Sequence, residues 1–172
     1  MMLNVQPFQE TLYAGMCGPA SLKIVAEYFG IKKTEKELAD MCGVDEELGV
    51  SDKDIVNAAQ TLGFETAIKD KASFGDIEEL LKKDIPVIVN WFTRGRTDYS
   101  DSTVADGHYS VVCGLDSEYI FLQDPEIGGI RKIKRGDFMK VWFDFTGSYI
   151  KSWDEMIIRQ IIIIYPKDRG DR

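Results

Sequence analysis

The stretch YAGMCGPASLKIVAEYFG (residues 13–30) combines a thiol with the signals of a helix start. Pro19 has no backbone N–H, so a helix tolerates it only in the first turn. Apolar residues then recur at helical spacing until Gly30 ends the pattern: Leu22, Val25, Ala26 and Phe29. This pattern predicts a helix that begins near residue 18, with Cys17 at its cap.

A cysteine in this position has two interpretations. The free N–H groups and the positive end of the helix dipole stabilise a thiolate there, and the same groups can hold a developing oxyanion. Alternatively, Cys17 is a buried structural cysteine, which is a common fate of a free thiol.

The rest of the chain continues with helices and then strands. Further helices are expected at 34–41, 51–62, 73–83 and 135–142, and those at 34–41 and 51–62 have capping residues in front. Strands are expected at 86–92, 108–115, 118–124, 129–134 and 156–165, the last as a central strand. Helices first and an antiparallel sheet afterwards predict an α+β fold, with a helical N-terminal half and a β-sheet in the C-terminal half.

The length and the distribution of polar residues indicate one domain over residues 1–172. A long polar segment, 93–107, leads directly into His108, and loops of this length within a domain are usually functional or mobile. Residues 166–172 form a polar tail.

Charge and hydropathy limit the partners and the compartment. The net charge of −8 argues against nucleic acid or an anionic membrane as the main partner. No signal peptide is visible, and the longest apolar run, 161–165, is too short to span a bilayer. An odd set of three cysteines suits a reducing compartment, so the cytoplasm is the expected location.

His108 is the single histidine of the chain, and Asp124 closes the strand that follows it. If the hairpin turn centres on Asp116 with an odd loop, His108 and Asp124 stand directly opposite each other on one face of the sheet. Their Cβ atoms are then about 5 Å apart, close enough for the carboxylate to accept the imidazole N–H. A two-residue loop shifts the pairing by one residue and puts the two side chains on opposite faces.

A thiol, a histidine and an orienting carboxylate form the set needed for nucleophilic catalysis. A zinc site is the main rival for cysteine and histidine ligands. It is disfavoured because no two cysteines are close in sequence and Cys113 points to the face of its strand opposite to His108. Cys42 and Cys113 are expected to be small buried hydrophobes. The residues call for neither a metal nor a cofactor.

Three blocks of the sequence resemble the bacteriocin-leader (double-glycine) cysteine peptidases and their stand-alone relatives. The blocks are CGPASL with Cys17, DGHYSVVCGL with His108, and IFLQDP with Asp124. The resemblance covers most of residues 6–165 and implies a papain-like fold, a thiol-protease mechanism and a peptide or protein substrate. The transporter-fused members continue into membrane and ATPase domains, so the resemblance implies the peptidase domain but not the transport role.

The family also places a glutamine six residues before the cysteine, where its amide helps to form the oxyanion hole. Gln9 stands in a similar context but eight residues before Cys17, and position 11 is Thr. A two-residue insertion near residues 14–15 reconciles the spacing. Gln9 is therefore the first candidate for the oxyanion hole, and Gln6 is the second.

The sequence thus predicts hydrolysis of a peptide or amide bond through an acyl-enzyme on Cys17, with His108 as base and Asp124 orienting it. Two alternatives stay open. One is a non-catalytic peptide-binding module on the same fold, although a pure binder does not need the thiol. The other is an acyltransferase, which uses the same triad with an acceptor other than water. The oligomeric state is left open.

Overall fold

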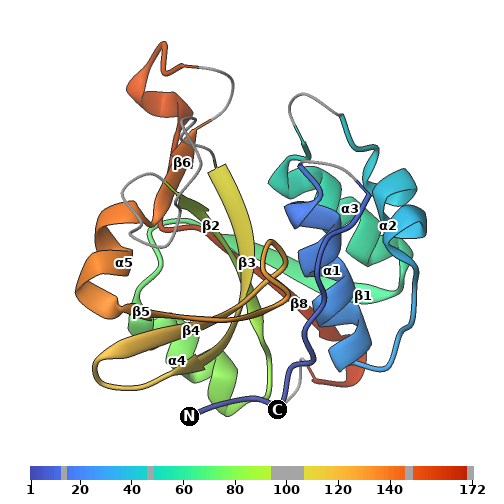
Figure 1. Cartoon of the computed structure of the whole chain (residues 1–172), viewed down its shortest axis with the longest axis horizontal. Helices are drawn as coiled ribbons and strands as arrows, with labels where there is room; N and C mark the ends of the chain where they lie inside the picture. Colours follow the sequence, from blue (N-terminus) through green and yellow to red (C-terminus); the bar gives the residue numbers. More distant parts are fainter. Residues whose placement is uncertain (13–14, 46–48, 94–106, 146–148, 170–172) are drawn as a thin grey trace.

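The computed structural model describes residues 1–12, 15–45, 49–93, 107–145 and 149–169 (Figure 1). The helices are α1 (Cys17–Tyr28), α2 (Glu35–Cys42), α3 (Asp52–Thr61), α4 (Phe74–Lys82) and α5 (Arg135–Val141). The strands are β1 (Phe64–Lys69), β2 (Val87–Phe92), β3 (Gly107–Leu115), β4 (Tyr119–Asp124), β5 (Gly129–Lys134), β6 (Phe143–Phe145), β7 (Met156–Ile158) and β8 (Ile161–Pro166). Short 3-10 turns cover Trp153–Glu155 and Lys167–Arg169.

Six strands form one antiparallel sheet in the order β1-β8-β2-β3-β4-β5, and β6 pairs with β7 in a separate ribbon. Helices α1 to α3 cover one face of the large sheet, and α4 and α5 cover the other (Figure 1). Strand residues alternate between the two cores, as Val111 and Val112 do, because successive side chains of a strand point to opposite faces. The α+β expectation is confirmed in this arrangement.

Helix α1 lies at the centre of the first core. Every residue from Gly18 to Ala26 is buried, because α2, α3 and β3 pack around it. Burying a side chain such as Leu22 stabilises the fold by roughly 1.5–3 kcal/mol. The start of α1 is thus held firmly in place by the packing of its own body.

The expected caps are present. Thr34 and Ser51 each form a capping box at the start of α2 and α3, and Gly43 ends α2 in the left-handed conformation. A third capping box, between Ser73 and Asp76, begins α4.

Two strand predictions need correction. The stretch 156–165 is not one strand, because Arg159 has a φ of 47° and breaks it. The half before the break pairs with β6, and the half after it forms β8 between β1 and β2. Strand β1 is absent from the sequence prediction; it is an edge strand with a single buried residue, Phe64, and so lacks an apolar run.

Most of the expected loop 93–107 lies outside the described residues, as does the end of the expected polar tail, 170–172. Within the described ranges, no helix is long and apolar enough to cross a membrane.

Candidate active site

Cys17 is the first residue of α1, with Met16 as the N-cap, so the helix begins one residue earlier than predicted. The thiol is partly exposed. At this position the backbone N–H groups of the first turn have no partner within the helix, and they lie at the positive end of the helix dipole. The local environment can therefore stabilise negative charge on sulfur or on a nearby oxygen.

Gly18 allows α1 to approach its neighbours closely beside the thiol. A Cβ on this residue would lie 2.2 Å from Val50 Cγ2, which is shorter than any real carbon–carbon contact. A larger residue after Cys17 would therefore force Val50 or the first turn of α1 to shift.

His108 is the second residue of β3, which begins at the same end of the molecule as α1 (Figure 1). The residue is 7% exposed, and the ring of Trp91, its direct partner on β2, packs edge-on against it at a centroid distance of 5.7 Å. The indole N–H donates to Ser110 Oγ at 3.0 Å and thereby fixes the Trp91 ring. The imidazole is thus shielded from water on one side.

The prediction that His108 stands directly opposite Asp124 is wrong. At the turn Leu115 pairs with Ile120, a register that alone puts the two side chains on opposite faces of the sheet. A bulge between Val112 and Gly114 then shifts the register by one residue. Asp124 consequently lies diagonally across from His108 and on the same face.

The two side chains nevertheless meet. His108 Nε2 lies 2.7 Å from Asp124 Oδ1, and both groups are buried. Because Nε2 is engaged by the carboxylate, Nδ1 is the imidazole nitrogen left to face the thiol, and Cys17 is close enough to interact electrostatically with His108. The structure therefore brings together the three residues that the sequence singled out.

Burial by itself lowers the pKa of His108. The hydrogen bonds to Asp124 and Cys17, together with the negative charges of these two groups, outweigh burial and hold the pKa of His108 well above its usual value of 6.5. At neutral pH this arrangement favours the protonated form of His108.

Arg131 on β5 holds Asp124 in place, and the sequence analysis did not find it. Arg131 Nε bonds Asp124 Oδ2, Arg131 Nη2 lies 2.8 Å from Glu126 Oε2, and the Glu126 N–H donates to Asp124 Oδ1 at 2.9 Å. Only the strand register could have indicated Arg131. Strand β5 pairs Gly129 with Asp124, and Arg131, two positions after Gly129, lies on the same face as Gly129.

Ligand atoms of His108, Asp124 and Glu126 lie within 4.8 Å of one another, which is close enough to hold a metal ion. The guanidinium of Arg131 is bound to both carboxylates, so it already supplies the positive charge that such a group needs. The donor set is therefore better described as an ion-pair network than as a metal centre.

Gln9, in the N-terminal segment, packs against the turn that follows β4. Its Nε2 donates to Glu126 O at 3.2 Å, and its Cβ is packed against Gly128. Gln6 donates to Asn4 Oδ1 at 3.0 Å on the surface. The oxyanion-hole role of Gln9 stays a prediction, and it requires the amide to exchange Glu126 O for the substrate.

Glu10, which the sequence analysis did not single out, lies beside the histidine–aspartate pair. Burial, helped by the nearby carboxylates Asp124, Glu126 and Glu35, raises the pKa of Glu10 to about 7, although the charge of His108 opposes the increase. No pattern in the sequence marks this residue, because its neighbours come from distant segments.

The other two cysteines are buried in the first core. Burial raises the pKa of Cys42 to about 12 and that of Cys113 to about 11, so both stay protonated at neutral pH. Their interpretation as small hydrophobic residues agrees with these positions.

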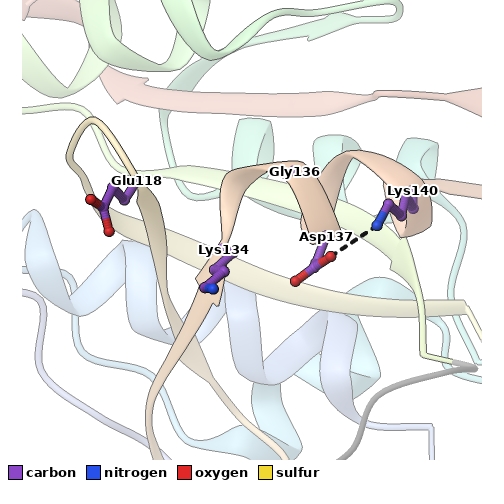
Figure 2. Close-up of a pocket in the computed structure, with 5 residues that line it drawn as sticks. All are labelled: Glu118, Lys134, Gly136, Asp137 and Lys140. Atoms are coloured by element: carbon purple, nitrogen blue, oxygen red, sulfur yellow. Dashed lines mark hydrogen bonds and ion pairs between the residues drawn. The ribbon is translucent and has the colours of Figure 1, made fainter.

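A separate surface pocket lies at the other end of the β3–β4 hairpin, away from Asp124 (Figure 2). It is lined by Glu118, Lys134, Gly136, Asp137 and Lys140. Asp137 and Lys140 pair with each other at 3.0 Å. Its lining has charged side chains but neither a thiol nor a histidine, so the pocket does not offer the chemistry of the site around Cys17.

Comparisons with known proteins point to peptidases. The sequence model of the Peptidase_C39 like family matches residues 2–150. An uncharacterised protein of Methanothermobacter marburgensis is 33% identical over 134 residues, which make up 78% of this chain and 79% of that protein. The transport/processing ATP-binding protein ComA of Streptococcus pneumoniae is 29% identical over 132 residues, 76% of this chain but 17% of ComA.

Solved structures show the same fold. The peptidase domain of Streptococcus ComA superposes with a TM-score of 0.70 at 22% identity, covering 95% of this chain and 100% of the domain. A double glycine motif protease from an AMS/PCAT transporter, in complex with its leader peptide, gives 0.64 at 20% identity, covering 96% and 98%. The expected papain-like fold is confirmed by these similarities.

Proposed function

Since this chain belongs to the Peptidase_C39 like family, we propose that it hydrolyses a peptide or amide bond through an acyl-enzyme on Cys17. One observation carries the proposal: His108 Nε2 lies 2.7 Å from Asp124 Oδ1, and Cys17 at the start of α1 interacts electrostatically with the same imidazole. A solved relative of the same fold is a protease in complex with a leader peptide, which supports a peptide as the substrate class.

In the first step, the thiolate of Cys17 attacks the carbonyl carbon of the substrate and a C–S bond forms. The carbonyl oxygen becomes an oxyanion, and the free N–H groups at the start of α1 stabilise it. The C–N bond then breaks, and the imidazolium of His108 gives its proton to the leaving amine. The products of this step are a thioester on Cys17, a free amine and a neutral imidazole.

In the second step, the neutral imidazole takes a proton from water, and the resulting hydroxide attacks the thioester carbon. The C–S bond breaks, the acid leaves, and His108 is again an imidazolium opposite the Cys17 thiolate. Asp124 keeps Nε2 protonated throughout and so reserves Nδ1 for proton transfer. Arg131 holds that carboxylate in place.

The first test is selective alkylation of the native protein with iodoacetamide at pH 7, followed by intact mass measurement. We expect one label, on Cys17, because Cys42 and Cys113 are buried and protonated. After denaturation all three thiols react. Cys17→Ala should abolish labelling of the native protein, and Cys42→Ala is the matched control that retains it.

His108→Gln should slow this alkylation by at least about tenfold, since the thiolate loses its partner cation. Labelling that is unchanged in His108→Gln, or equal labelling of all three cysteines in the native protein, would contradict the proposal.

The alternatives separate by their products. A peptide aldehyde should form a C–S bond with Cys17, a hemithioacetal, in an enzyme, whereas a binding module holds the aldehyde without a covalent bond. With a peptide substrate and an added primary amine, hydrolysis gives the free acid and acyl transfer gives the amide. We expect the free acid as the main product.

A further inference from the structure

Glu10 lies beside the candidate site, and hydrogen bonds hold the backbone around it. Its N–H donates to Pro125 O at 2.8 Å, directly after Asp124. The next residue, Thr11, is held by Glu35, which accepts from its N–H at 3.0 Å and from its hydroxyl at 2.7 Å. The backbone at Glu10 is therefore anchored on both sides, between α2 and the end of β4.

The carboxylate of Glu10 is unusual for one so close to a catalytic pair. Its Oε2 is buried and has no hydrogen-bond partner within the part of the chain that the structure describes. The charged groups that act on it come from several elements: His108 on β3, Asp124 at the end of β4, Glu126 in the following turn and Glu35 on α2. Arg131 on β5 is itself bound to two of these carboxylates.

The interaction with His108 is the one attraction among these charge interactions. Electrostatic coupling between two sites is reciprocal, so a charge on His108 that favours ionised Glu10 is itself favoured by ionised Glu10. The three carboxylates oppose ionisation of Glu10 but do not prevent it. Near neutral pH the residue can therefore act as a negative charge beside the imidazolium.

We propose that Glu10 is a positioning residue of the candidate site, whose carboxylate stabilises the imidazolium of His108 and, through it, the thiolate of Cys17. This proposal deepens the proposed function and rests on it. Glu10 does not touch the reacting atoms; it adjusts the proton equilibrium of the group that does. Glu10 acts in addition to Asp124 and Cys17, which raise the pKa of His108.

The single histidine allows a direct measurement. NMR titration of the His108 ring signals reports its protonation in the intact protein without assignment ambiguity. In Glu10→Gln, which keeps the shape and removes the charge, we expect the His108 midpoint to fall by about half a pH unit. We also expect a small step in the wild-type His108 signal near pH 7, where Glu10 ionises, to disappear in the variant.

The control variants separate this effect from general ones. Glu118→Gln makes the same change in net charge at the far end of the β3–β4 hairpin and should leave the His108 titration unchanged. Glu10→Asp retains the charge on a shorter side chain and should restore at least part of the shift. If Glu10→Gln loses the native NMR spectrum, Glu10→Asp and the wild-type step near pH 7 still decide the matter.

The rate of Cys17 alkylation completes the experiment. We expect Glu10→Gln to lower this rate by about threefold at pH 8, matching the half-unit shift, with less effect at pH 6. An unchanged His108 midpoint in Glu10→Gln overturns the role of Glu10, even if Cys17 alkylation supports the peptidase. Conversely, a shifted midpoint with no reaction at Cys17 supports the Glu10–His108 coupling and overturns the proposed function.

Discussion

At the scale of single residues, Asp124 depends on more than its histidine partner. The carboxylate is fully buried, and a buried charge without partners is costly. Arg131 and the Glu126 N–H satisfy it from one side while His108 occupies the other. The histidine–aspartate pair is therefore one part of a network that includes β5.

Arg131→Met tests this network. Removing one partner of a buried ion pair leaves the other charge uncompensated, so we expect the free energy of unfolding to fall by about 3–5 kcal/mol. Chemical denaturation measures it. Lys132→Met, an exposed neighbour on the same strand, is the control and should cost less than about 1 kcal/mol. Equal effects of the two substitutions would show that Arg131 does not support Asp124.

At the scale of elements, two local features place the site. The bulge at Val112–Gly114 turns β3 so that His108 and Asp124 share a face, although the hairpin turn alone would separate them. The close approach of α1 to Val50 at Gly18 fixes the first turn of the helix directly after Cys17. Both features are irregularities, and both lie within a few residues of the groups they position.

Gly18→Ala tests the close approach of α1. The new Cβ meets Val50 Cγ2, so α1 must shift at its first turn, and we expect a loss of about 1–3 kcal/mol in stability together with slower alkylation of Cys17. Val50→Ala removes the obstructing methyl group. The double variant Gly18→Ala/Val50→Ala should therefore recover the alkylation rate relative to Gly18→Ala alone. Failure of this rescue would mean that the obstruction is not the cause.

At the scale of the whole molecule, the two cores on opposite faces of the large sheet support different parts of the candidate site. The first core, with α1 to α3, supports Cys17, and the second contains Trp91, which packs against His108. The candidate site also gathers groups from segments far apart in the chain, such as Glu10 and Arg131. The charged groups of the candidate site therefore become neighbours only when the chain folds.

The pH dependence of stability should report this balance. Glu10 has a pKa of about 7 in the folded state and about 4.5 when unfolded, so the folded state holds its proton more strongly. Its contribution to stability is fully present below about pH 4.5 and is lost as pH rises to 7. We expect Glu10→Gln to become more stable relative to wild type across this range, measured by urea denaturation at several pH values. A constant difference between the two proteins would contradict the shifted pKa.

The sequence alone determined what local physics controls. Pro19 and the apolar spacing behind it located α1 to within one residue, side-chain capping located α2 and α3, and the β-branched run located β2. Cys17, His108 and Asp124 could be selected because their types and contexts carry chemistry. These features depend on the nearest few residues, so a sequence contains them in full.

Only the tertiary structure decided the rest. The bulge that re-registers β3, the break at Arg159 and the edge strand β1 follow from pairing with distant segments. Arg131 and Glu10 reach the site in the same way, from elements that are separated from it in sequence. Long-range pairing and burial are set by the packing of the complete chain, and no short pattern records which buried charges will become neighbours.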